Sequence, residues 1–184
     1  MKGNSPGYEV SESSGEFLLK EEIRLIIEMQ REFFESLPVE KIGHVCFEPM
    51  VPVYQSGMRQ QSGQDAQGFR NEFYKSLLPG QRALLGFFTY YDHAIRSRDE
   101  FQRTTTLYLS GRFFAIVKKG AEYFEAESMQ YLLLEIEKTF SEQNEIQNVR
   151  IDELYNRLNE IAPYTMSQIG ACIKDNPTEY VNFK

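Results

Sequence analysis

The sequence contains no tryptophan, only two cysteines and no apolar run long enough to cross a bilayer. Cys46 and Cys172 cannot build a disulfide framework, so we expect reduced thiols in a cytoplasm. Residues 1–7 lack the apolar core of a signal peptide, which also favours a cytoplasmic location without membrane contact. No glycine-rich phosphate loop and no paired metal-ligand spacing is present. We therefore predict no catalytic residue, no cofactor and no metal site.

The composition predicts one folded unit. Of 184 residues, 41% are hydrophobic and 14% aromatic, which is too apolar for a disordered chain. We expect a flexible N-terminal arm over 1–12 and a single helical domain over 13–184. Within that domain, glutamine, serine and glycine dominate residues 55–68, which predicts a mobile loop.

Apolar residues recur at helical spacing through most of the chain, which predicts a mainly α, single-domain helical bundle. Pro38 and Pro163 are each expected to end a helix, because the residue before proline avoids helical angles. Pro49 and Pro52 favour an extended segment over 39–55. The predicted helices span 19–37, 68–77, 80–96, 99–118, 128–140, 150–161 and 164–175.

The segment 104–117 supports two readings. Two runs rich in β-branched and aromatic residues flank Ser110-Gly111, which is typical of a β-hairpin and would make the fold α+β. The same residues also form an apolar helical stripe that includes Phe101, Tyr108 and Ile116.

The net charge of −7 is unevenly distributed. Residues 61–120 carry nine basic and five acidic side chains, whereas residues 121–184 carry five basic and twelve acidic ones. Such asymmetry favours an acidic surface that attracts a basic partner, although the two regions could also meet across a homodimer. The carboxylates that we expect at this surface are Glu122, Glu125, Glu127, Glu135, Glu137, Asp152 and Glu153.

Three alternatives to an acidic protein-binding surface have less support in the sequence. Cys46 or Cys172 with His93 could form a thiol enzyme or hydrolase, but neither cysteine has a recognisable nucleophile setting. His44 and Cys46 would share one face of a strand and could supply two zinc ligands, but the other candidates, His93, Cys172 and carboxylates, show no paired ligand spacing. Arginines and tyrosines between 90 and 119 could stack and bind single-stranded nucleic acid, but the acidic chain argues against direct binding.

From about residue 77 to the C-terminus, the chain carries a series of short motifs. In order along the chain they are Leu78-Pro79, Glu100-Phe101-Gln102, Ser110-Gly111, Phe140, Ile151-Asp152-Glu153-Leu154, Asn156-Arg157-Leu158, Ile173, Asn176-Pro177 and Glu179-Tyr180. In their order and spacing the chain resembles a family of small bacterial proteins named for a DNA mimic. The family typically carries Asn-Gly-Gly-Phe-x-Gln where this chain reads Arg98-Asp99-Glu100-Phe101-Gln102, so that the role of the glycines cannot be carried over.

The resemblance implies an all-helical fold, which favours the helical reading of 99–118. It also implies a non-enzymatic protein whose carboxylates imitate phosphates and occupy the basic site of a DNA-binding protein. We therefore predict a protein-binding module with an acidic surface for a basic protein partner. An immunity-type protein that neutralises a toxin is the first alternative, and the thiol enzyme is the second.

Overall fold

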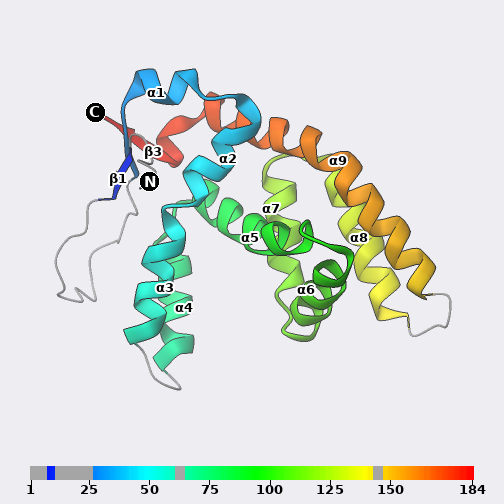
Figure 1. The fold of residues 1–184 in the computed structure, drawn as a ribbon. Helices are drawn as coiled ribbons and strands as arrows, with labels where there is room; N and C mark the ends of the chain where they lie inside the picture. The colour runs from blue at the N-terminus through cyan, green and yellow to red at the C-terminus, as the bar shows by residue number, and fades with distance from the viewer. Residues whose placement is uncertain (1–7, 11–26, 61–64, 143–146) are drawn as a thin grey trace, which may run out of the picture.

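The computed structural model describes residues 8–10, 27–60, 65–142 and 147–184, and it confirms the mainly α fold (Figure 1). Short strands lie near both ends of the described chain, and helices form the rest. The elements are β1 (Tyr8–Val10), β2 (Ile27–Met29), α1 (Arg31–Ser36), α2 (Val39–Phe47), α3 (Met50–Gln60), α4 (Asp65–Ser76), α5 (Pro79–Ala94), α6 (Arg98–Ser110), α7 (Phe114–Tyr123), α8 (Glu127–Ser141), α9 (Gln147–Asp175), the 3₁₀ turn η1 (Pro177–Glu179) and β3 (Val181–Phe183).

Helix α5 lies at the centre of the molecule and packs against α2, α6 and α7. The prediction of a helix over 80–96 is confirmed, and its apolar residues Leu84, Phe87 and Phe88 are buried. Pro79 occupies the first turn, where its missing N–H breaks no helical bond. The predicted helix over 128–140 is likewise confirmed as α8.

Two predicted helices at the C-terminal end are in fact one. Helix α9 runs through Pro163, so the prediction that Pro163 ends a helix is wrong. A proline inside a helix costs one backbone hydrogen bond, roughly 3 kcal/mol. Leu158, Ala162 and Met166 are buried on both sides of the proline, and their packing offsets that cost.

The ambiguous segment forms two helices, which rules out both the hairpin at 104–117 and the single helix over 99–118. Helix α6 ends at Ser110, and α7 begins at Phe114. Between them Arg112 adopts a left-handed backbone with φ of 60°, and the Phe113 N–H donates to the Tyr108 carbonyl at 2.8 Å. The turn lets α7 pack against α5, a tertiary contact that local propensity does not encode.

The predicted extended segment at 39–55 is wrong, because α2 and α3 are helical there. Pro49 lies between the two helices, and Pro52 lies in the first turn of α3, where prolines are tolerated. The predicted loop over 55–68 is also wrong where the structure describes it. Helix α3 extends to Gln60 and α4 starts at Asp65, whereas 61–64 lie outside the described residues.

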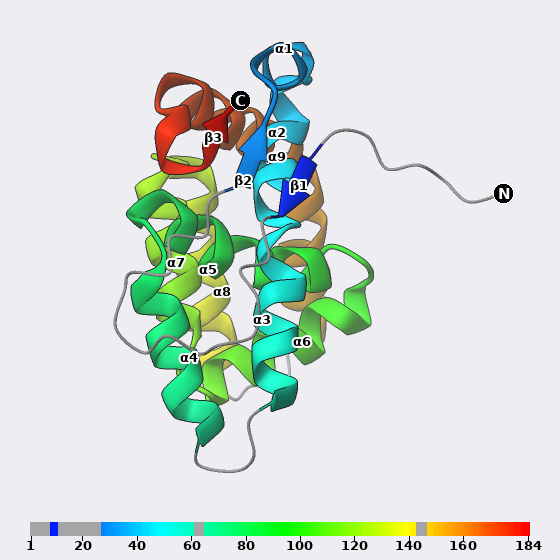
Figure 2. The same ribbon diagram turned by 90° about the vertical axis from the view of Figure 1, so that its left-hand side faces the viewer.

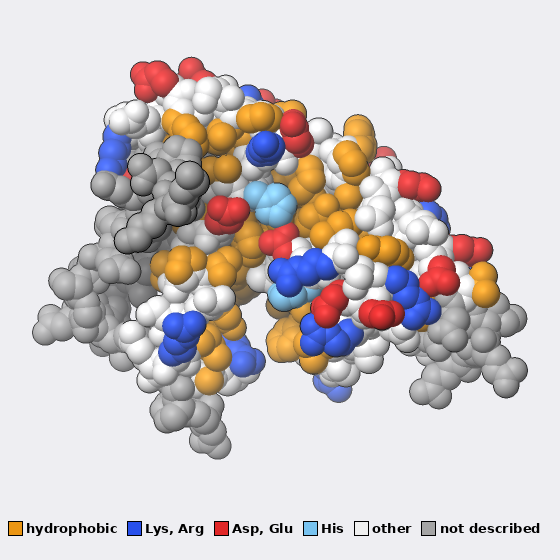
Figure 3. Space-filling view, in the orientation of Figure 1, with side chains coloured by type: hydrophobic (Ala, Val, Ile, Leu, Met, Phe, Trp, Pro, Cys, Tyr) orange, Lys and Arg blue, Asp and Glu red, His pale blue; other side chains and the backbone are white. Residues whose placement is uncertain are grey.

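Helices α3 and α4 form a hairpin that projects beside α6 (Figures 1 and 2). Tyr54, Phe69 and Phe73 hold the hairpin together, with ring centroids 5.4 to 6.0 Å apart. A notch is visible between the hairpin and α6 at the lower edge of Figure 3.

The N-terminal predictions are only partly testable. Residues 27–29 form strand β2, so a helix over 19–37 is wrong there, whereas 19–26 lie outside the described residues. Strand β2 pairs antiparallel with β1 and parallel with β3, which joins the two ends of the chain. Of the predicted flexible arm over 1–12, residues 8–10 belong to this sheet, and the others lie outside the described residues. No described helix has both the length and the apolar character needed to cross a membrane.

Candidate functional site

Large apolar side chains are unexpectedly exposed on α8 and α9, the two helices that carry five of the seven predicted carboxylates. Tyr131 of α8 is 71% exposed and Tyr164 of α9 is 60% exposed. Leu134 of α8 and Val149 of α9 are also exposed. An amphipathic helix normally turns such side chains toward the core, as α8 does with Leu132, and their exposure marks a candidate contact surface.

Cross-helix contacts fix how α8 and α9 lie against each other. Arg157 forms an ion pair with Glu135, and Arg150 lies 3.8 Å from the carboxylate of Glu142. Farther along, the Gln168 side chain donates to the Glu125 carbonyl at 3.4 Å. The three contacts share one antiparallel register, which continues past Pro163.

This register places the two exposed tyrosines on one face. Tyr131 stands one helical turn before Glu135, so these two side chains share one face of α8. Tyr164 stands two turns after Arg157, so these two share one face of α9. Because Glu135 and Arg157 form an ion pair, the two faces adjoin. Acidic, basic and apolar side chains are interspersed along the outer edge of α9 in Figure 3. We define the tyrosine–glutamate face as Glu127, Tyr131, Leu134, Glu135 and Lys138 of α8 and Glu142 directly after it, together with Arg150, Glu153, Arg157, Glu160 and Tyr164 of α9.

The charge that this face presents is negative. Its three cations are all engaged, since Lys138 and Arg150 approach Glu142 and Arg157 pairs with Glu135. Among described residues, no cation lies within ion-pair distance of the exposed carboxylates Glu127, Glu153 and Glu160.

The seven predicted carboxylates fall into two groups. Glu135, Glu137 and Asp152 are ion-paired with Arg157, Lys118 and Arg98 of the same chain. The others are exposed and have no ion pair with a described residue. Glu127 and Glu153 belong to the tyrosine–glutamate face, whereas Glu122 lies on α7 and Glu125 in the turn before α8. The exposed members are Glu122, Glu125, Glu127 and Glu153.

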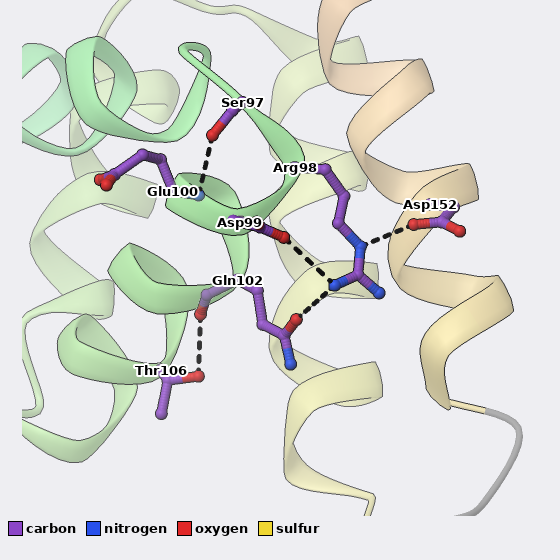
Figure 4. A network of polar contacts seen from close by, with 7 residues as sticks. All are labelled: Ser97, Arg98, Asp99, Glu100, Gln102, Thr106 and Asp152. Carbon is purple, nitrogen blue, oxygen red and sulfur yellow. Dashed lines mark hydrogen bonds and ion pairs between the residues drawn. The ribbon is translucent and has the colours of Figure 1, made fainter.

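The flank of α9 that carries Asp152 is fastened to α6 by a polar network (Figure 4). The Arg98 guanidinium donates to Asp152 at 2.7 Å and to Gln102 at 2.7 Å, and the hydrogen bond that Asp152 accepts is the main cause that raises the pKa of Arg98. Ser97 accepts the Glu100 N–H at 3.2 Å and caps α6. The segment that departs from the DNA-mimic pattern therefore anchors one helix to another.

The C-terminal Asn-Pro-x-Glu-Tyr tail also has a structural role. The Glu179 carboxylate accepts the Gly80 N–H at 2.8 Å and the Tyr123 hydroxyl at 2.7 Å. It thereby satisfies a free amide at the start of α5 and joins the tail to α7. Burial and the bond to Glu179 raise the pKa of Tyr123 to about 12.

The thiols do not have the environment of a nucleophile. Burial raises the pKa of Cys46 to about 12, and burial also raises that of Cys172. A reactive cysteine needs the opposite shift. His44 and Cys46 lie on a helix rather than a strand, so Cys46 is buried while His44 contacts Asp92 at 3.7 Å. Within the described residues, no cluster of three potential metal ligands occurs.

The sequence analysis did not single out Tyr131, Leu134, Glu160 and Tyr164. Tyr131 and Leu134 lie off the apolar stripe of α8, and that mismatch is the signal by which they could have been found. Comparisons with protein families, with curated proteins and with solved structures found no match. The function is therefore inferred from the residues of the chain itself.

Proposed function

We propose that this protein is a non-enzymatic binding module whose tyrosine–glutamate face binds a basic protein partner. The observation that carries the proposal is the exposure of Tyr131 and Tyr164 among carboxylates that have no cation partner in the described structure. Tyrosine is enriched at protein interfaces because its ring supplies apolar contact area and its hydroxyl tolerates water.

The sign of the charge selects the partner. Glu127, Glu153 and Glu160 attract Lys and Arg side chains and repel the phosphates of nucleic acid. A second copy that docked by the same face would bring the same carboxylates against them, because a twofold interface pairs a surface with itself. A basic protein is therefore favoured over a homodimer through this face.

The resemblance to DNA mimics supports a finer proposal, in which the partner is a DNA-binding protein. Such a protein has a basic site that an acidic surface can occupy. The carboxylates without a cation partner, rather than Glu135, Glu137 and Asp152, would carry that contact. A toxin with a basic surface is the alternative partner, and both would use the same face.

The test is affinity capture from a lysate of the native cell at low and high salt. The wild-type chain should retain a basic protein that salt releases, because salt screens exposed charges. Glu127→Lys/Glu153→Lys/Glu160→Lys should lose that protein. The matched control is Glu32→Lys/Glu35→Lys/Glu40→Lys, which changes the net charge equally on exposed positions of α1 and α2 and should keep it.

Two outcomes would contradict the proposal. One is the absence of any captured protein at either salt concentration. The other is a protein that both triple variants retain or both lose equally, because binding would then not depend on the tyrosine–glutamate face. Circular dichroism of each variant checks that the helices are intact.

A further inference from the structure

Each exposed tyrosine of the tyrosine–glutamate face has a glutamate one helical turn before it. Glu127 precedes Tyr131 on α8, and Glu160 precedes Tyr164 on α9. Residues four apart on a helix are neighbours on its surface. All four side chains are exposed, and neither carboxylate has an ion pair with a described residue. The face thus presents the same combination of ring and carboxylate twice.

This combination matches the chemistry of arginine. The planar guanidinium stacks on an aromatic face and donates several hydrogen bonds in a fixed fork, which a carboxylate accepts. A lysine ammonium is a compact and strongly hydrated charge, so it gains less from the ring. The chain itself contains such a contact, in which the Arg31 guanidinium lies 4.3 Å from the centroid of the Phe183 ring.

We propose that the partner binds through arginine side chains, one at Glu127/Tyr131 and one at Glu160/Tyr164. The inference rests on the proposed function and specifies the residue type that the face recognises. Packed helices lie about 8–10 Å apart, and the shared register offsets the two tyrosines by about one turn. The two sites are therefore roughly 10 Å apart, a spacing that arginines three positions apart on one side of a polyproline II segment reach, since that helix has three residues per turn and a rise of about 3.1 Å.

The experiment compares two peptides of equal charge, nona-arginine and nona-lysine, whose binding to the full chain is measured by isothermal titration calorimetry at low salt. Wild type should bind nona-arginine more tightly. Tyr131→Leu/Tyr164→Leu keeps apolar bulk but removes both rings, and should weaken nona-arginine binding roughly five- to thirtyfold. It should leave nona-lysine binding nearly unchanged. Tyr131→Phe/Tyr164→Phe keeps the rings and should retain the preference for arginine.

Charge variants separate this inference from the proposed function. Glu127→Gln/Glu160→Gln should weaken the binding of both peptides. The control Glu32→Gln/Glu40→Gln should weaken the binding of both peptides much less. Equal binding of the two peptides, with no effect of the tyrosine variants but a loss in the glutamate variant, would overturn the arginine inference and support the acidic face. If the glutamate variant and the control behave alike, or neither peptide binds, both proposals fail.

Discussion

Arg157 of α9 forms an ion pair with Glu135 of α8, and the antiparallel register places both exposed tyrosines of the tyrosine–glutamate face toward the same end of the helices from this pair. It joins the two helices and also neutralises a carboxylate that would otherwise face the proposed partner. The side chains are 46% and 37% exposed, so solvent screens their attraction. We therefore expect the pair to affect binding more than stability.

Replacing Arg157 should accordingly strengthen the binding of a basic ligand. In Arg157→Gln, Glu135 becomes available, and we expect several-fold tighter binding of nona-arginine. The free energy of unfolding should fall by less than about 1 kcal/mol, as for other exposed ion pairs. Calorimetry and urea unfolding measure the two effects. Arg98→Gln is the control, because Arg98 pairs with Asp152, which is not part of the tyrosine–glutamate face, and its loss should leave peptide binding nearly unchanged. Weaker peptide binding by Arg157→Gln would contradict the assignment of the tyrosine–glutamate face as the binding surface.

Close packing of α2 against α9 predicts a strong effect at Gly170. A Cβ atom there would lie 1.7 Å from the Val39 carbonyl oxygen, so Gly170→Ala must push the helices apart. We expect the free energy of unfolding to fall by at least about 2 kcal/mol in urea titrations.

The matched control for that change is Gly68→Ala in α4, where nothing lies within 4 Å of the added Cβ. Alanine is the better helix former, so this variant should gain about 0.5–1 kcal/mol. Similar effects of the two substitutions would contradict the packing of α2 on α9.

The thiols should react slowly in the folded protein. Burial raises the pKa of Cys46 to about 12 and raises that of Cys172, so the thiolate population at pH 8 is small. With a chromogenic disulfide reagent at pH 8, Cys46 should react only as the chain unfolds, and Cys172 more slowly than free cysteine. Fast modification that His93→Ala slows would instead favour the thiol-enzyme hypothesis.

Alkaline pH should destabilise the attachment of the C-terminal tail. The pKa of Tyr123 is about 12 in the folded chain and roughly 10 in an unfolded one, so the folded state holds this proton more tightly. Its stabilising effect is complete below pH 10 and is lost as pH rises toward 12. Urea unfolding between pH 9 and 12 should show a smaller decline for Tyr123→Phe than for wild type. Equal declines would show that Tyr123 does not contribute.

Local sequence patterns were sufficient to predict helices α5 and α8, since the apolar stripes of these helices are long and contain no internal proline. They failed at Pro163, Pro49 and Pro52, where the cost of a proline depends on its place in the helix and on what the flanking residues bury. They also failed at Ser110-Gly111, because the turn there is set by how α7 packs on α5.

The acidic surface, too, depends partly on the sequence alone and partly on the tertiary structure. The sequence by itself determined the excess of carboxylates after residue 120 and the mainly α fold, because composition and periodicity are properties of the chain alone. Only the tertiary structure decided that Glu135, Glu137 and Asp152 are neutralised by cations from other helices. It also brought Tyr131 and Tyr164 onto one face, since the register of two antiparallel helices depends on contacts between residues far apart in the sequence.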